Sequence, residues 1–132
     1  MSMITHGTRA FGSPSRYIQG RWELNRLKEY TDAYGKRVLI LVDCFFYGEY
    51  KVKFENMYSE GESSVTVIEF KGEITAEKID QIAESVKQFN PDVVAGMGGG
   101  KTMDTAKAVA DIFKAATVII PTTASTDAPV IG

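Results

Sequence analysis

Residues 92–113 read DVVAGMGGGKTMDTAKAVADIF, and this stretch decides the fold. Its start is apolar and β-branched, its centre holds consecutive glycines, and its second half places apolar residues at helical spacing. A strand, a glycine-rich turn and a helix in that order direct a helix N-terminus at the turn, where it favours an anion. Lys101 adds a positive charge. The stretch therefore predicts a phosphate-binding turn, the alternative being a tight turn that only lets helix and sheet pack closely.

The glycine pattern lies between two known nucleotide-binding patterns. The ATP/GTP loop, G-x-x-x-x-G-K-[ST], requires a glycine where this chain has Ala95. The dinucleotide fingerprint, G-x-G-x-x-G, requires a glycine where this chain has Lys101. The pattern alone leaves the kind of nucleotide open.

Strand-like and helix-like segments alternate through the rest of the chain. We expect strands at 17–20, 37–43, 64–70, 92–96 and 117–120, and helices at 22–34, 46–60, 75–89 and 101–113. The continuously apolar run at 37–43 is typical of a strand buried on both faces of a parallel sheet. The alternation predicts an α/β, Rossmann-like, doubly wound domain with a mainly parallel sheet. We expect residues 1–15 to form a flexible lead-in and residues 16–132 to form that domain.

Polar residues follow three of the expected strands. Asp43 ends one strand, the glycine turn follows another, and the hydroxyl-rich segment 122–127 follows the last. Ligands bind at the carboxyl ends of strands in such sheets, so we expect these groups to share a site. Asp43 can accept hydrogen bonds from a ribose, or it can cap the next helix. Segment 122–127 can contact phosphate or a hydroxylated substrate, or it can be an ordinary Ser/Thr turn.

Composition excludes several classes of function. The chain has 132 residues and a net charge of −2, so it has no electrostatic signature of nucleic-acid binding. No apolar run approaches the length of a membrane helix. Cys44 is the only cysteine, which rules out a disulfide within the chain and favours a cytoplasmic location. His6 is the only histidine, so a metal site with two histidines cannot be built from this chain.

Four motifs in fixed order resemble one family. SPSRYIQG, VLILVD, GMGGGKTMDTAKAVAD and PTTASTDAP resemble the glycerol dehydrogenases, which belong to the so-called iron-containing alcohol dehydrogenase superfamily that also holds dehydroquinate synthase. The resemblance covers residues 13–132. It extends only over the N-terminal, NAD-binding domain of these two-domain enzymes.

The resemblance implies a role for each matching residue. Asp43 corresponds to the acid that contacts the adenosine ribose, and Asp127 to the acid beside the polyol substrate and the nicotinamide. The residues that match the pyrophosphate loop are Gly99, Gly100, Lys101 and Thr102, and those that line the adenine and phosphate side are Thr122 and Ser125. The family oxidises the secondary alcohol of glycerol or a 1,2-diol to a ketone and transfers hydride to NAD⁺, assisted by a zinc ion.

The family's zinc ligands, an aspartate and two histidines of the C-terminal helical domain, have no counterpart in this chain. We therefore expect the polypeptide to bind NAD, to hold no metal or catalytic residue, and to be inactive alone. The surface that would face the missing domain leads us to expect a homo-oligomer. Two alternatives stay open: a non-catalytic module for nucleotide binding or self-association, and a P-loop nucleotide hydrolase.

Overall fold

The fold is built on one mainly parallel sheet. The computed structural model describes residues 7–8, 14–17 and 24–122. Within these residues six strands lie in the order β1-β2-β6-β5-β3-β4. Their bounds are β1 (Gly7–Thr8), β2 (Pro14–Tyr17), β3 (Arg37–Asp43), β4 (Ser64–Phe70), β5 (Val93–Gly98) and β6 (Ala116–Pro121). Only β1 and β2 pair in antiparallel fashion, and the other pairs are parallel, which confirms the predicted α/β fold class.

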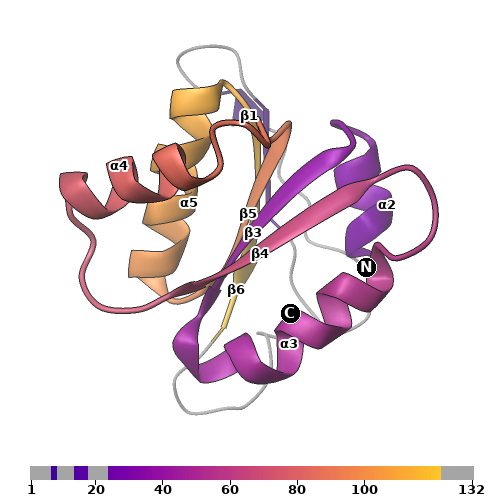
Figure 1. Ribbon diagram of the computed structural model, residues 1–132, viewed down its shortest axis with the longest axis horizontal. Helices are drawn as coiled ribbons and strands as arrows, with labels where there is room; N and C mark the ends of the chain where they lie inside the picture. The colour runs from indigo at the N-terminus through magenta and orange to yellow at the C-terminus, as the bar shows by residue number, and fades with distance from the viewer. Residues whose placement is uncertain (1–6, 9–13, 18–23, 123–132) are drawn as a thin grey trace.

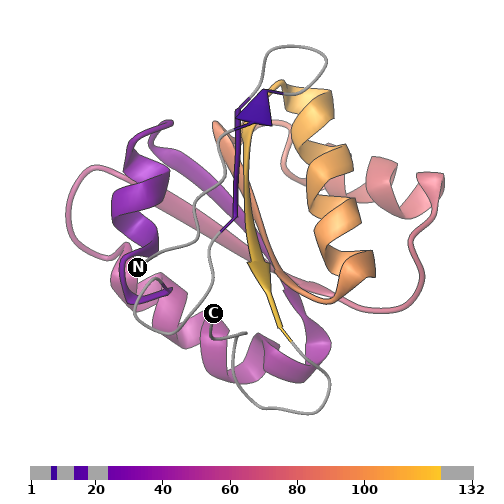
Figure 2. The same ribbon diagram turned by 180° about the vertical axis from the view of Figure 1, so that it is seen from behind.

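Helices cover both faces of the sheet. They are α2 (Leu27–Asp32), α3 (Cys44–Met57), α4 (Ala76–Ser85) and α5 (Gly100–Phe113). Figures 1 and 2 show α2 and α3 on one face and α4 and α5 on the other. The sheet is therefore doubly wound, as the alternation of elements predicts.

Strand β3 lies between the two halves of the core. Five consecutive residues, from Val38 to Val42, are fully buried. Ile40 and its even-numbered neighbours pack with α2 and α3, whereas Leu39 and Leu41 pack with α4 and α5. This alternation explains why the segment is continuously apolar, since both of its faces need apolar side chains.

The strand order creates one switch point. The chain passes from β3 outward to β4 on one side, and from β5 outward to β6 on the other, although β3 and β5 are neighbours. In doubly wound sheets, ligands bind at the carboxyl ends of strands where the winding direction reverses. Figure 1 shows these ends at its lower side, where α3 and α5 begin.

Several boundaries differ from the predicted ones. The predicted strand at 17–20 is replaced by β2, which ends at Tyr17, and the rest of that prediction lies outside the described residues. Strand β1 is not predicted at all. Strand β5 continues to Gly98, beyond its predicted end at Gly96, so one of the expected loop glycines, Gly98, is a strand residue. β2 runs across the predicted boundary between residues 15 and 16, and that boundary stays a prediction.

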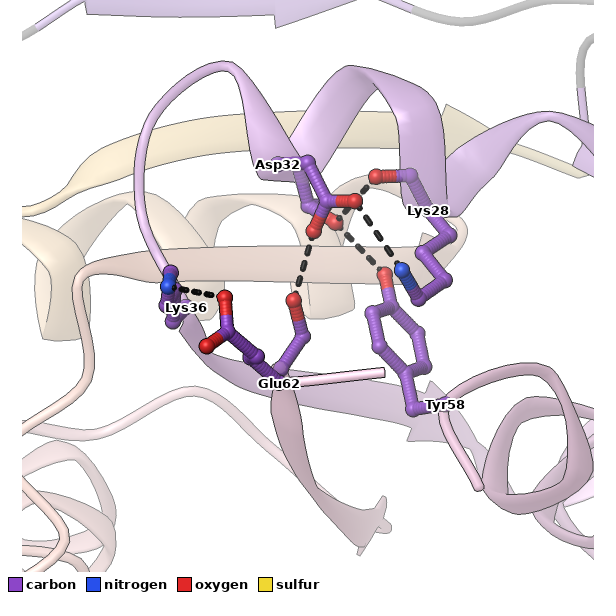
Figure 3. A network of polar contacts seen from close by, with 7 residues as sticks. Lys28, Asp32, Lys36, Tyr58 and Glu62 are labelled. Atoms are coloured by element: carbon purple, nitrogen blue, oxygen red, sulfur yellow. Dashed lines mark hydrogen bonds and ion pairs between the residues drawn. The ribbon is translucent and has the colours of Figure 1, made fainter. Parts of the chain in front are cut away.

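A polar network closes the opposite, amino-terminal edge of the sheet (Figure 3). The hydroxyls of Thr31 and Tyr58 are 2.7 Å apart, and the Ser63 hydroxyl donates to Asp32 at 2.6 Å. The ammonium of Lys28 donates to the same carboxylate at 3.0 Å. Burial raises the pKa of Tyr58 to about 12, so its hydroxyl keeps its proton. The network ties α2 to the end of α3 and to the residue before β4.

Asp92, the residue before β5, binds the start of β3 at this same edge. Its carboxylate accepts a hydrogen bond from the Arg37 guanidinium at 2.9 Å and from the main-chain N–H groups of Lys36 and Arg37 at 3.1 Å each. The hydrogen bond from the Arg37 side chain is the main cause that lowers the pKa of Asp92. At the amino edge, Asp32 and Asp92 are thus hydrogen-bonded to neighbouring protein groups. The residues that the sequence analysis predicts as a site lie at the carboxyl edge instead.

Candidate functional site

Gly98 lies at the centre of the carboxyl edge. A Cβ on this buried glycine would lie 2.8 Å from Thr102 Oγ1 and 2.9 Å from Asp43 Cβ, so no larger residue fits without rearrangement. Its carbonyl accepts a hydrogen bond from the main-chain N–H of Thr122 at 3.1 Å. Three residues predicted from separate segments therefore surround one glycine. Gly98 itself is not among the predicted site residues, and its place in the G-x-G start of the pattern is the signal that points to it.

Two glycines of the run have no packing role. A Cβ at Gly99 or Gly100 would meet no described atom within 4 Å, and both residues are exposed. Gly99 has an ordinary φ of −85°. By contrast, a Cβ at Gly96 would lie 2.7 Å from Ala106 Cβ, so helix packing requires that glycine. Close packing of helix and sheet, the alternative interpretation of the glycine run, thus explains why residues 96 and 98 are glycine. It does not explain why Gly99 and Gly100 are glycine.

Helix α5 presents its N-terminus at these two glycines. Gly99 is the N-cap residue and has no side chain to cap the helix, and its carbonyl accepts the first helical bond, from Met103. In any α-helix the first N–H groups lack intrahelical acceptors and carry a partial positive charge. The geometry can therefore accept an anion that approaches the bare backbone of Gly99 and Gly100.

The turn is too short for an ATP/GTP loop. Gly99 alone separates β5 from α5. The residues that would wrap the phosphates in that pattern, from Ala95 to Gly98, are buried in β5 and paired with its neighbours. The site therefore differs from that loop and has a direct strand-to-helix turn.

Asp43 caps helix α3, which is the alternative role predicted for it from the sequence. Its Oδ1 accepts a hydrogen bond from the Phe45 main-chain N–H at 2.9 Å, which caps α3 and starts that helix directly after β3. The residue is half-buried at the switch point. A carboxylate has about four acceptor positions, so capping leaves capacity for a ligand hydroxyl.

Lys101 has a partner that the sequence analysis did not identify. Its ammonium donates to Glu73 Oε1 at 2.8 Å, and Glu73 lies in the connection between β4 and α4. The only available signal in the sequence is that Glu73 follows a strand that ends at the same edge. Thr102, next along α5, is buried against Gly98 rather than open to solvent.

Some predicted features lie beyond what the structure describes. Ser125 and Asp127 fall outside the described residues. Within 24–122 and the short strands before it, no three His, Cys, Asp or Glu residues lie close enough together to hold a metal ion. Over the same ranges no helix has the length and apolar character to cross a membrane.

The class of protein follows from comparison with known families. The model of the family described as iron-containing alcohol dehydrogenase matches residues 14–131. This chain therefore belongs to the iron-containing alcohol dehydrogenase family.

Individual relatives make the similarity more specific. The chain is 43% identical to a glycerol dehydrogenase from Thermotoga maritima over 88% of its own length and 31% of the relative's. It is 36% identical to a glycerol dehydrogenase from Pseudomonas putida, covering 92% of this chain and 33% of that one. The crystal structure of glycerol dehydrogenase from Schizosaccharomyces pombe superposes with a TM-score of 0.73 at 28% identity, covering 95% of this chain and 30% of that one. The chain thus spans about a third of the length of these relatives.

Proposed function

We propose that the chain binds NAD at the carboxyl edge of its sheet. The observation that carries the proposal is that Gly99 and Gly100 are exposed and that no described residue lies close enough to either to require a glycine. Glycine at such positions allows a ligand to approach the backbone closely, and the N-terminus of α5 suits the negative charge of a pyrophosphate.

Each part of the cofactor has a proposed partner. Asp43 accepts hydrogen bonds from the adenosine ribose, and Gly99, Gly100 and Lys101 surround the pyrophosphate together with the main chain of Thr102, whose side chain is buried. Thr122 and Ser125 contact the adenine and phosphate side. NAD supplies the acceptor for a hydride. Asp127 is proposed to orient the alcohol substrate.

We further propose that the protein is an oxidoreductase that converts the secondary alcohol of glycerol or a related 1,2-diol to a ketone. The glycerol dehydrogenases among its relatives support this substrate class. Because the chain spans about a third of their length, we propose that these 132 residues alone are inactive and that a zinc ion, where one acts, is held outside them. We propose a cytoplasmic location because the chain has a single cysteine, Cys44, and self-association through the surface that would face the family's second domain.

Titration of the polypeptide with NAD in a calorimeter tests the binding proposal. We expect Lys101→Met to weaken NAD binding about tenfold or more, because it removes a charge-assisted hydrogen bond to phosphate. Lys107→Met, which removes the same charge further along α5, is the matched control and should leave the dissociation constant nearly unchanged. Equal affinities of the two variants would contradict the proposal.

A second assay tests the proposed inactivity. The polypeptide is mixed with zinc, NAD and glycerol, and NADH absorbance is followed. We expect no turnover above background, and sustained NADH production would overturn this part of the proposal. Light scattering on the same sample tests self-association, which a clean monomer would contradict.

A further inference from the structure

A carboxylate is paired with the cation of the proposed pyrophosphate site. Glu73 Oε1 accepts a hydrogen bond from Lys101 Nζ at 2.8 Å. The side chain of Glu73 is 72% exposed and that of Lys101 is 57% exposed, so the ion pair lies at the surface where a ligand can reach it. The two residues come from different elements, Glu73 from the connection before α4 and Lys101 from the first turn of α5.

This pairing opposes anion binding in a specific way. Lys101 is the second residue of α5, beside the free N–H groups of the helix and the exposed glycines. A phosphate oxygen and the Glu73 carboxylate are both acceptors for the same ammonium, and they repel each other at close range. A pyrophosphate that uses Lys101 therefore has to displace Glu73 or share the ammonium with it.

The energies favour displacement. An exposed ion pair contributes little to stability, because water and salt screen it. A phosphate at the start of α5 gains the helix N–H groups as well as the ammonium. The ligand can thus replace the carboxylate at a modest cost in affinity.

We propose that Glu73 is an internal competitor for Lys101 that sets how tightly the cofactor is held. This inference rests on the proposed function, and it assigns a role to a residue outside the family motifs found in the sequence. The competition weakens NAD binding and speeds NAD release, since Glu73 can recapture the ammonium as the phosphate leaves. Release of a bound product limits turnover in many enzymes, so weaker binding of the cofactor has a functional use.

Glu73→Gln in the intact protein tests this role, because it keeps the size of the side chain and removes its charge. We expect the dissociation constant for NAD to fall about two- to fivefold, the equivalent of one exposed ion pair. Glu84→Gln, an exposed residue near the other end of α4, removes the same charge and should leave the constant unchanged.

The double variant separates competition from simple repulsion. In a Lys101→Met background, Glu73→Gln should no longer improve NAD binding, because no ammonium is left to compete for. A gain that persists in that background overturns the inference, and so does a Glu73→Gln protein that binds NAD as wild type does or more weakly.

Failure of the proposed function gives a different pattern. If the wild-type protein does not bind NAD, or if Lys101→Met binds it as tightly as wild type, the pyrophosphate site and this inference both fail. If Lys101→Met weakens binding while Glu73→Gln has no effect, only the inference about Glu73 fails.

Discussion

The Asp43 carboxylate accepts a hydrogen bond from the Phe45 main-chain N–H at 2.9 Å, so the residue proposed to hold a ribose also begins α3. The two roles draw on different properties of the side chain. Capping needs an oxygen acceptor at this position, which asparagine also supplies. A strong hydrogen bond to a ribose hydroxyl needs the negative charge.

Substitution of Asp43 should therefore separate stability from binding. We expect Asp43→Asn to change the free energy of unfolding by less than about 0.5 kcal/mol and Asp43→Ala to lower it by about 1 kcal/mol, since only alanine removes the cap. Both variants should bind NAD more weakly than wild type. Urea denaturation and calorimetric titration measure the two effects.

The asparagine variant also tests the choice between cofactors. Its neutral amide should reduce discrimination against the 2′-phosphate of NADP, which a carboxylate repels. If Asp43→Asn binds NAD as wild type does, Asp43 is a helix cap and nothing more.

The glycine run provides a matched pair of substitutions. Gly98→Ala should lower the free energy of unfolding by about 1–3 kcal/mol, because its Cβ would lie 2.8 Å from Thr102 Oγ1. Gly100→Ala meets no described atom within 4 Å and lies in a helix, so it should keep or raise stability by up to about 1 kcal/mol.

Because Gly100→Ala should not destabilise the fold, a change in its NAD affinity would reflect the contact with the ligand. We expect its affinity to fall about tenfold, because the added methyl group blocks close approach to the backbone. A stable Gly100→Ala protein with wild-type NAD affinity would contradict the proposed position of the pyrophosphate.

Asp92 should contribute to stability in a manner that depends on pH. The Arg37 side chain is the main cause that holds the pKa of Asp92 below its ordinary value of 3.8. A carboxyl group with a lowered folded-state pKa stabilises the fold above its unfolded-state pKa, and this contribution is lost as the pH falls through the folded-state value. At neutral pH we expect Asp92→Asn to cost about 1–2 kcal/mol, less than a buried charge pair because water screens it.

Denaturation from neutral pH down to strongly acidic pH measures this dependence. The difference between wild type and Asp92→Asn should shrink as the pH falls below 3.8. Asp80→Asn makes the same chemical change on the exposed side of α4 and is the control. A difference between wild type and Asp92→Asn that stays constant over the whole range would show that the charge of Asp92 is not responsible.

The Tyr58 hydroxyl should stabilise the amino edge by an amount typical of one buried hydrogen bond. Tyr58→Phe removes the 2.7 Å contact with Thr31 and should lower the free energy of unfolding by about 1 kcal/mol. Tyr47→Phe removes a hydroxyl from the same helix, outside this network, and should have a smaller effect. Equal effects in urea denaturation would show that the Thr31 contact adds no stability. NAD binding should be unchanged in Tyr58→Phe, because the network lies at the edge opposite the candidate site.

Local patterns in the sequence predict the elements better than their arrangement. The buried strand β3 and the helix after the glycines are predicted because apolar periodicity reports directly on burial. The two-residue β1 is missed, since so short a strand has no periodicity and depends on its pairing with β2. The end of β5 is missed because glycine is a weak strand former. A glycine is required at Gly98 because Thr102 of α5 packs closely against it.

The candidate site is predicted only in part for a related reason. Asp43, Lys101 and Thr122 are found because each follows a strand-like run, and such runs end at one edge. Glu73 is missed because its contact with Lys101 joins two residues that are distant in sequence. The central position of Gly98 depends on β3, β5 and β6 being neighbours, and strand order is not a local property of the sequence.

The single-residue connection at Gly99 has a thermodynamic consequence. A long loop that folds around phosphates loses conformational entropy when the ligand binds. Here β5 leads almost directly into α5, and the contact of Gly96 with Ala106 fixes the helix against the strand. The backbone that would meet the ligand is thus already ordered, so most of the entropy lost on binding would come from the ligand itself.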